Sequence, residues 1–422
     1  MALNPDTPLR WAATATDGSG NPDPDVREML MNRQGNILKG HGRPEVSLIF
    51  FSIDPRKAVA AKQALHDIAN QHITNAWQQL QDSRSFKLTG LGGGSFVHLA
   101  LAQSGYVAIG MGNLHRGASE HFESGMRQQF SIDSLLDPDT SVWEDGFKQQ
   151  IDGVVLVADL YRSATDGLAK ELEAVLAGGG CTILKVQQGS GLDNAAGHGI
   201  EHFGYVDGRS QPLVLVEDIH AEATPAADRP EHWNPAFPLS TALVEDPGAR
   251  GRNSYGSYFI FRKLEQDVRG FKRTEHLVAD ELGLSGDERE LAGAMLVGRF
   301  EDGTPVVESK SALGKANVPN DFNYDDDQTG SRCPFHAHIR KTNPRGAGGS
   351  PSTKFEDMTA EQRRELLDSE RRHLFLRRGI PYQDVPRKVH PDELPDAATT
   401  EEFDQKVAAL LPDRDVGLLF MA

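Results

Sequence analysis

The sequence of 422 residues contains little cysteine, no long apolar run and fewer basic than acidic side chains. Its two cysteines, Cys181 and Cys333, lie at no CxxC or disulfide-scaffold spacing, which favours a reducing, cytoplasmic location. No apolar stretch approaches the length that spans a bilayer, and the N-terminus lacks the basic and apolar regions of a signal peptide. The 44 basic residues against 61 acidic ones give a formal charge of −17, which disfavours nucleic acid or an anionic membrane as partner.

The composition is that of an ordinary soluble protein, with 38% hydrophobic and 25% charged residues in a chain long enough for two or three domains. In the first half, apolar runs predict strands at 46–53, 96–102, 106–111, 153–161 and 181–188. Periodic apolar positions predict helices at about 56–82 and 166–180. The order strand, helix, strand, strand, helix, strand is typical of a ferredoxin-like domain.

A similar pattern begins again after a Pro- and Ala-rich segment near 222–250, which has the composition of a linker. There we predict strands at 256–264 and 417–422 and helices at 285–299 and 399–411. Ser285 and Glu288 have the spacing of a capping box at the start of the first of these helices. The resulting prediction is an α+β chain with antiparallel sheets, in four parts: an irregular arm (1–44), a ferredoxin-like domain (45–221), a linker (222–250) and a second ferredoxin-like domain (251–422).

Two segments contain charged residues in unusual surroundings. The stretch EHFGYVDGRSQP (201–212) contains a GxxDG pattern, which alone is weak because Asp207 and Gly208 also fit an ordinary Asp-Gly turn. The stretch RRHLFLRRGIPY (371–382) places Arg377 and Arg378 directly after an apolar run. An arginine at the end of a buried segment implies an anionic or polar group that meets it.

A third segment, CPFHAHIRKTNPR (333–345), combines two histidines with three basic side chains in an acidic protein. On a strand, His336 and His338 would point to the same face. Ordinary core histidines or a pair of zinc ligands are alternatives, but no further ligand lies at a convincing spacing for zinc.

Together with RQGNILKGHGRP at 33–44, these segments resemble the dye-decolorising (DyP-type) haem peroxidases. The resemblance implies two ferredoxin-like halves with haem b bound between sheet and helices. It also implies that His338 is the proximal ligand of the haem iron. Arg345, with Arg340 as a second candidate, would pair with the haem propionates. Asp207 and Arg377 would lie on the distal side, where the carboxylate transfers the proton of the peroxide and the arginine stabilises the developing charge, which yields a ferryl haem.

The implied activity is oxidation of bulky phenols and dyes by hydrogen peroxide, with an optimum on the acid side of neutral because a carboxylate beside an arginine stays ionised there. Family members continue beyond the strand at 417–422 with a carboxylate behind the proximal histidine. A shortened chain, a split protein completed by a C-terminal polypeptide and a degenerate homologue therefore stay open, as does a homo-oligomer. A haem-binding protein with little turnover and a non-haem interaction module are the alternative functions.

Overall fold

The computed structural model describes residues 4–12, 23–115, 119–222, 232–246, 248, 253–314, 320–347 and 358–422. Residues 223–231 of the predicted linker lie outside these ranges. The chain divides into two compact units, with residues 1–3, 22–190 and 243–259 in the first and residues 4–21, 191–242 and 260–422 in the second. Within the described ranges, no helix combines the length and apolar character that a membrane crossing requires.

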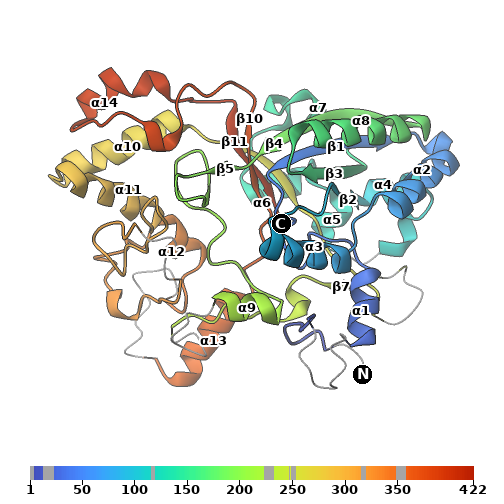
Figure 1. Ribbon diagram of the computed structural model, residues 1–422, viewed down its shortest axis with the longest axis horizontal. Coiled ribbons are helices and arrows are strands. Elements are labelled where there is room, and N and C mark those ends of the chain that lie inside the picture. Colours follow the sequence, from blue (N-terminus) through green and yellow to red (C-terminus); the bar gives the residue numbers. More distant parts are fainter. Residues whose placement is uncertain are drawn as a thin grey trace. The chain divides into compact units, whose positions relative to one another are not determined.

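The first unit is built on an antiparallel sheet of four strands in the order β2-β3-β1-β4 (Figure 1). Its strands are β1 (Glu45–Ile53), β2 (Phe96–Leu101), β3 (Gly153–Asp159) and β4 (Cys181–Ser190). Two long helices pack against this sheet: α2 (Ala58–Gln71), which follows β1, and α8 (Arg162–Gly178), which joins β3 to β4. This order and connectivity confirm the ferredoxin-like arrangement predicted from the first half of the sequence.

Further helices and strands complete this unit. They are helices α1 (Pro24–Met31), α3 (Ala76–Thr89), α4 (Gln103–Ala108), α5 (Glu120–Ser124), α6 (Gln129–Leu135) and α7 (Asp145–Lys148), with the small strands β7 (Val244–Glu245) and β8 (Tyr255–Gly256).

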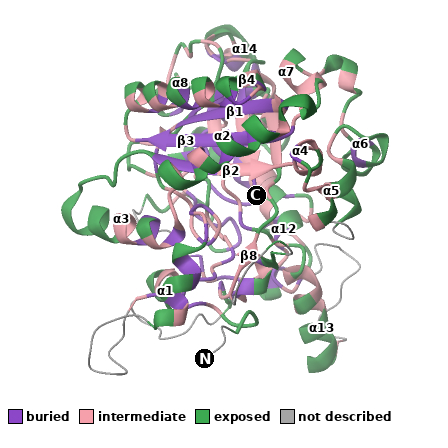
Figure 2. Cartoon of the chain, turned by 90° about the vertical axis from the view of Figure 1, so that its right-hand side faces the viewer, coloured by how far each residue is buried: buried purple, intermediate pink, exposed green. Residues whose placement is uncertain are grey.

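The core of the first unit lies between the sheet and its two long helices. Every residue of β3 is buried, and β1 is buried over most of its length, as Figure 2 shows. Ile49 and Val155 of the sheet belong to one cluster with Leu172 of α8. The apolar runs in the sequence therefore correspond to strands covered on both faces.

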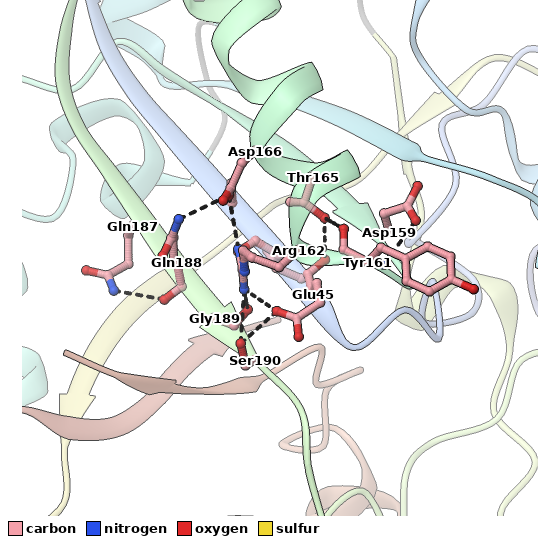
Figure 3. Close-up of polar contacts among 12 residues, drawn as sticks. Glu45, Asp159, Tyr161, Arg162, Thr165, Asp166, Gln187, Gln188, Gly189 and Ser190 are labelled. Carbon is pink, nitrogen blue, oxygen red and sulfur yellow. Dashed lines mark hydrogen bonds and ion pairs between the residues drawn. The ribbon is translucent and has the colours of Figure 1, made fainter. Parts of the chain in front are cut away.

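Arg162 attaches the start of α8 to the sheet (Figure 3). Its guanidinium group donates to the carbonyl oxygens of Val46 at 3.0 Å and Gly189 at 2.6 Å, and it pairs with the carboxylate of Glu45. One side chain thereby links two neighbouring strands to the helix that covers them.

The second unit contains a three-stranded antiparallel sheet in the order β10-β11-β9 among its described residues. The strands are β9 (Phe261–Glu265), β10 (Ile380–Gln383) and β11 (Val416–Met421), with β5 (Leu192–Asp193) and β6 (Gly199–Ile200) forming a small hairpin. The helices are α9 (Val216–Glu222), α10 (Val268–Glu281), α11 (Glu290–Val297), α12 (His338–Thr342), α13 (Ala360–Arg371) and α14 (Thr400–Lys406). Antiparallel sheets with separate helices in both units confirm the α+β class.

Some predicted elements are wrong. The run at 106–111, predicted as a strand, belongs to helix α4 and the turn after it. Helix α4 packs closely against the backbone of Asp152. Only glycine fits at position 105, because a Cβ atom there would lie 2.2 Å from the carbonyl oxygen of Asp152. The single helix predicted at 56–82 is two helices, since Asn75 caps α3 through the backbone N–H of Gln78. The 285–299 helix begins only at Glu290, and Ser285 makes no capping hydrogen bond.

Candidate functional site

The GxxDG segment forms a tight loop after β6 in the second unit. The backbone N–H of Asp207 donates to the carbonyl oxygen of Gly199 at 3.0 Å, and Ile200 forms a bridge with Val206. The N–H of Gly208 donates to the Asp207 carboxylate at 2.6 Å, and Gly208 has a φ of 77°, a conformation that favours glycine. The loop thereby holds the Asp207 carboxylate at an exposed position.

Arg377 is the basic residue that meets this carboxylate. Its guanidinium group lies 3.9 Å from the carboxylate of Asp207 and donates to the carbonyl oxygen of Arg209 at 3.1 Å. Arg378 instead donates its backbone N–H to Met421 at 2.6 Å and its guanidinium to the carbonyl oxygen of Arg377 at 2.9 Å. The structure thus separates the two neighbouring arginines and places Arg377 beside Asp207.

Gln211 fixes the backbone of Arg377 against the GxxDG loop. Its side-chain oxygen accepts the N–H of Arg377 at 3.0 Å, and its side-chain N–H donates to the carbonyl oxygen of the same residue at 3.3 Å. The side-chain amide of Gln211 thus makes the two hydrogen bonds to Arg377 that a neighbouring strand's backbone would make. Gln211 therefore sets the position of Arg377 relative to Asp207.

His202 makes a second attachment between the same two segments. Its Nε2 donates to the carbonyl oxygen of Tyr382 at 2.8 Å, and its Nδ1 accepts from Arg387 at 2.9 Å. The ring is buried, and burial lowers its pKa to about 4. A neutral ring is required here because a protonated Nδ1 could not accept from Arg387.

Four other side chains support the loop from within the unit. Tyr205 donates its hydroxyl to Glu275 at 2.5 Å, and Lys272 pairs with Glu275 at 3.0 Å. Glu201 accepts the N–H groups of Phe203 and Tyr205 at 2.8 and 3.1 Å. Burial raises the pKa of Glu201 to about 7, and the charge of Asp207 adds to this effect. The loop that carries Asp207 is therefore held by fixed polar contacts along its length.

His338 begins the short helix α12, so the strand predicted for this stretch is wrong. The alternation in HAHIR therefore does not place His336 and His338 on one strand face. His336 lies in the preceding turn and is exposed. His338 also has solvent-accessible surface, but surrounding protein lowers its pKa, with Arg377 lowering it further and Asp207 raising it. The structure thus brings His338 within electrostatic range of both Asp207 and Arg377.

Arg345 lies in a cluster with a second buried arginine, Arg299, that the sequence did not indicate. Both guanidinium groups donate to Oγ of Ser210, at 2.6 and 3.0 Å, and to Oδ1 of Asn320, at 3.0 and 2.8 Å. Arg345 also donates to the carbonyl oxygens of Asn320 and Phe322 at 2.8 and 2.6 Å. Burial lowers the pKa of Arg345 to about 9 and of Arg299 to about 10.

Among the described residues, the acceptors of these two arginines are all neutral oxygens. Glu222 and Asp321 act on Arg345 only at longer range. Ser210 and Arg345 have φ values of 59° and 53°, which are unfavourable for residues with a side chain. Two buried cations without a directly bonded carboxylate, held by strained backbone, form a site that suits an anion.

Arg340 has a different environment. It is fully buried and donates to the carboxylate of Asp327 and to the carbonyl oxygen of Cys333, at 2.9 and 2.6 Å. Asp327 also accepts the backbone N–H groups of Arg332 and Cys333, at 3.0 and 2.9 Å. This ion pair closes the loop that leads into α12, so Arg340 helps to fix the start of the helix at His338.

The functional residues missed from the sequence are Gln211, His202, Arg299 and Ser210. A signal was present for two of them, because Ser210 and Gln211 belong to the SQP flank that makes the GxxDG segment distinctive. Nothing in the local sequence marks Arg299, which reaches the site only through the fold.

Comparisons with known proteins indicate the family of this chain. Residues 32–191 match a family model described as the DyP dimeric alpha+beta barrel domain. The multifunctional dye peroxidase DyP2 of Amycolatopsis sp. is 39% identical over 423 residues, covering 100% of this chain and 82% of that protein. Peroxidase 2 of Mycetinis scorodonius is 33% identical over 358 residues, covering 81% of this chain and 64% of that protein.

Solved structures give the same result. A DyP-type peroxidase from Anabaena sp. superposes with a TM-score of 0.84 at 33% identity, covering 100% of this chain and 83% of that one. The structure of DyP2 from Amycolatopsis sp. superposes with a TM-score of 0.81 at 38% identity, with coverage of 100% and 81%.

Proposed function

This chain belongs to the DyP-type peroxidase family, and from that premise we propose that it is a haem b peroxidase that uses hydrogen peroxide to oxidise bulky organic donors such as phenols and dyes. The observation that carries the proposal is the distance of 3.9 Å between Asp207 and Arg377, with His338 in electrostatic range of both. A haem-binding protein without turnover would not require this pair.

His338 fits the role of iron ligand. Iron binds the neutral form of imidazole, and protein packed around the ring lowers the pKa of His338 and favours that form. Within the described residues, the ring nitrogens of His338 form no hydrogen bond, so a ligand atom is available for the metal.

Arg345 fits a partner of a haem propionate better than Arg340 does. Arg345 and Arg299 have only neutral acceptors, so a carboxylate can replace a shared serine or amide oxygen and neutralise the charge. Arg340 is already paired with the buried carboxylate of Asp327. We therefore assign propionate binding to Arg345 and Arg299, and stabilisation of the His338 loop to Arg340.

The distal pair performs the acid–base work. Haem, when bound, supplies the iron that accepts the oxidising equivalents of the peroxide. The Asp207 carboxylate would take a proton from one oxygen of the peroxide and return it to the other oxygen, which leaves as water. The Arg377 guanidinium stabilises the negative charge that develops on the leaving oxygen. Gln211 holds the backbone of Arg377 so that its guanidinium group stays beside Asp207 during this transfer.

A cytoplasmic location and assembly with another copy stay predictions from the sequence.

The histidine pair in the 333–345 segment provides a direct test. The purified protein is titrated with haem and its Soret absorption is recorded for the wild type, His338→Ala and His336→Ala. We expect His338→Ala to lose the ligated spectrum and His336→Ala to retain it, because His338 begins α12 and lies in electrostatic range of Asp207 and Arg377. Equal spectra for all three proteins would remove His338 from the proposal.

A further inference from the structure

Arg33, in the first unit, is a buried cation without a hydrogen-bond acceptor. Its side chain is 3% exposed, and none of its three guanidinium nitrogens has a partner among the described residues. A guanidinium group carries five N–H donors and keeps its charge at neutral pH. Its recorded neighbour is the ring of Tyr255, whose centroid lies 5.2 Å from the guanidinium carbon. A contact with an aromatic ring offsets only part of the loss of hydration of a buried charge.

The backbone around Arg33 is firmly placed. The carbonyl oxygen of Arg33 accepts the N–H of Ala76 at 2.8 Å, and the N–H of Gly35 donates to Thr74 at 2.8 Å. The side chain of Gln34 accepts from and donates to the backbone of Leu99, with both distances 2.8 Å. These bonds attach residues 33–35 to the edge of the sheet at β2 and to the start of α3. The guanidinium group is therefore buried by the fold itself.

Other buried arginines of the described chain find acceptors. Arg43 lies in the same N-terminal segment and is 8% exposed. It donates to the carbonyl oxygens of Gly94 at 2.7 Å and His41 at 3.1 Å, and lies 3.6 Å from the carboxylate of Asp82. Arg299, Arg340 and Arg345 are also hydrogen-bonded. Arg33 thus differs from arginines of comparable burial, and a group from outside the described chain is required to complete it.

We propose that Arg33 and the ring of Tyr255 form a binding site for the carboxylate group of a ligand. The planar fork of an arginine matches the two oxygens of a carboxylate. No second basic side chain of the described residues acts on the pKa of Arg33, so the site offers one positive charge, which suits a monoanion better than a phosphate dianion. The ligand is a small carboxylic acid, and this inference does not depend on the proposed function.

The proposal predicts opposite effects on stability for two matched substitutions. Arg33→Met removes an unpaired charge while keeping a long side chain, so the ligand-free protein should melt at a temperature higher by roughly 2–4 °C. Arg43→Met removes a paired charge and leaves its acceptors without donors, so it should lower the melting temperature. Differential scanning calorimetry of the two ligand-free variants and the wild type measures both shifts.

Two probes test whether the site recognises a carboxylate. Benzoate is tested by thermal shift, with benzyl alcohol as its uncharged counterpart. We expect benzoate to stabilise the wild type and benzyl alcohol to have no such effect. Loss of the benzoate effect in Arg33→Met supports the site.

One outcome overturns the site whether or not the wild type binds haem. A lower melting temperature for ligand-free Arg33→Met, with wild-type response to every probe, would mean that Arg33 has an acceptor within the chain. Failure of the wild type to bind haem would refute the proposed function, but the calorimetry and the benzoate titration would still test Arg33.

Discussion

Because Gln211 holds the backbone of Arg377, we expect substitution of Gln211 to slow catalysis only by displacing Arg377. Gln211→Ala removes both hydrogen bonds to the backbone of Arg377, at 3.0 and 3.3 Å, without touching the charges of Asp207 or Arg377. Arg377 then keeps its bond to the carbonyl oxygen of Arg209, but its backbone is free to move away from the loop. The guanidinium group would spend less time near the carboxylate, and peroxide cleavage would slow.

The geometry limits the size of this effect. A net hydrogen bond contributes about 0.5–1.5 kcal/mol, and the bond at 3.3 Å belongs at the weak end of that range. If the sum of about 1–2 kcal/mol is used entirely to hold Arg377 in place, kcat/KM for hydrogen peroxide falls roughly fivefold to thirtyfold. Removal of a catalytic proton-transfer group costs more, about 10²–10⁴-fold. Gln211→Ala should therefore be intermediate between the wild type and a variant of Asp207.

Steady-state kinetics with haem-loaded protein give the assay, with peroxide and donor varied separately. Gln34→Ala is the matched control, because Gln34 makes the same pair of bonds to the backbone of Leu99 in the first unit, at 2.8 Å each. Both variants should lose stability, but only Gln211→Ala should lose kcat/KM for peroxide. Gln211→Glu keeps one acceptor for the N–H of Arg377 and should recover part of the rate. Equal kinetic losses in Gln211→Ala and Gln34→Ala would refute a positioning role.

Two further predictions concern buried titratable groups. Asp327→Ala leaves the fully buried Arg340 without its counter-ion and should lower the free energy of unfolding by about 3–5 kcal/mol, measured by urea denaturation. The double variant Asp327→Ala with Arg340→Met should recover much of this loss, because it removes the unpaired charge as well. His98 and His202 are buried, and burial lowers the pKa of each to about 4, so the unfolded chain binds more protons between that value and about 6.5. Stability should thus be unchanged above pH 7 and fall by about 2–3 kcal/mol per histidine as the pH drops to 4.5; a His98→Gln variant whose stability falls as steeply as that of the wild type would contradict this.

The class of fold could be predicted from the sequence because its information is local, whereas the roles of the motif residues were implied by a family resemblance and stay predictions. Asp207, Arg377 and His338 each lie in a segment with unusual composition, and the strands of the first unit are apolar runs that the sheet buries on both faces. The structure then brings the three residues into one unit, within reach of each other's charges.

The parts that could not be predicted depend on contacts distant in sequence. HAHIR alternates like a strand, but the buried pair of Arg340 and Asp327 folds it into a turn and a helix. Gly105 determines α4 through its close approach to Asp152, 47 positions later in the chain. Arg299 joins Arg345 only because Ser210 and Asn320 lie between them in space. Tertiary contacts of this kind override local pattern.

The distal pair is the centre of the account, and one rate constant tests it directly. Haem-loaded wild type and Asp207→Asn are mixed with one equivalent of hydrogen peroxide, and the change in Soret absorption is followed by stopped flow. We expect Asp207→Asn to bind haem normally but to react at least about 100-fold more slowly, because the amide cannot take the peroxide proton. A variant that binds haem and reacts at the wild-type rate would contradict it.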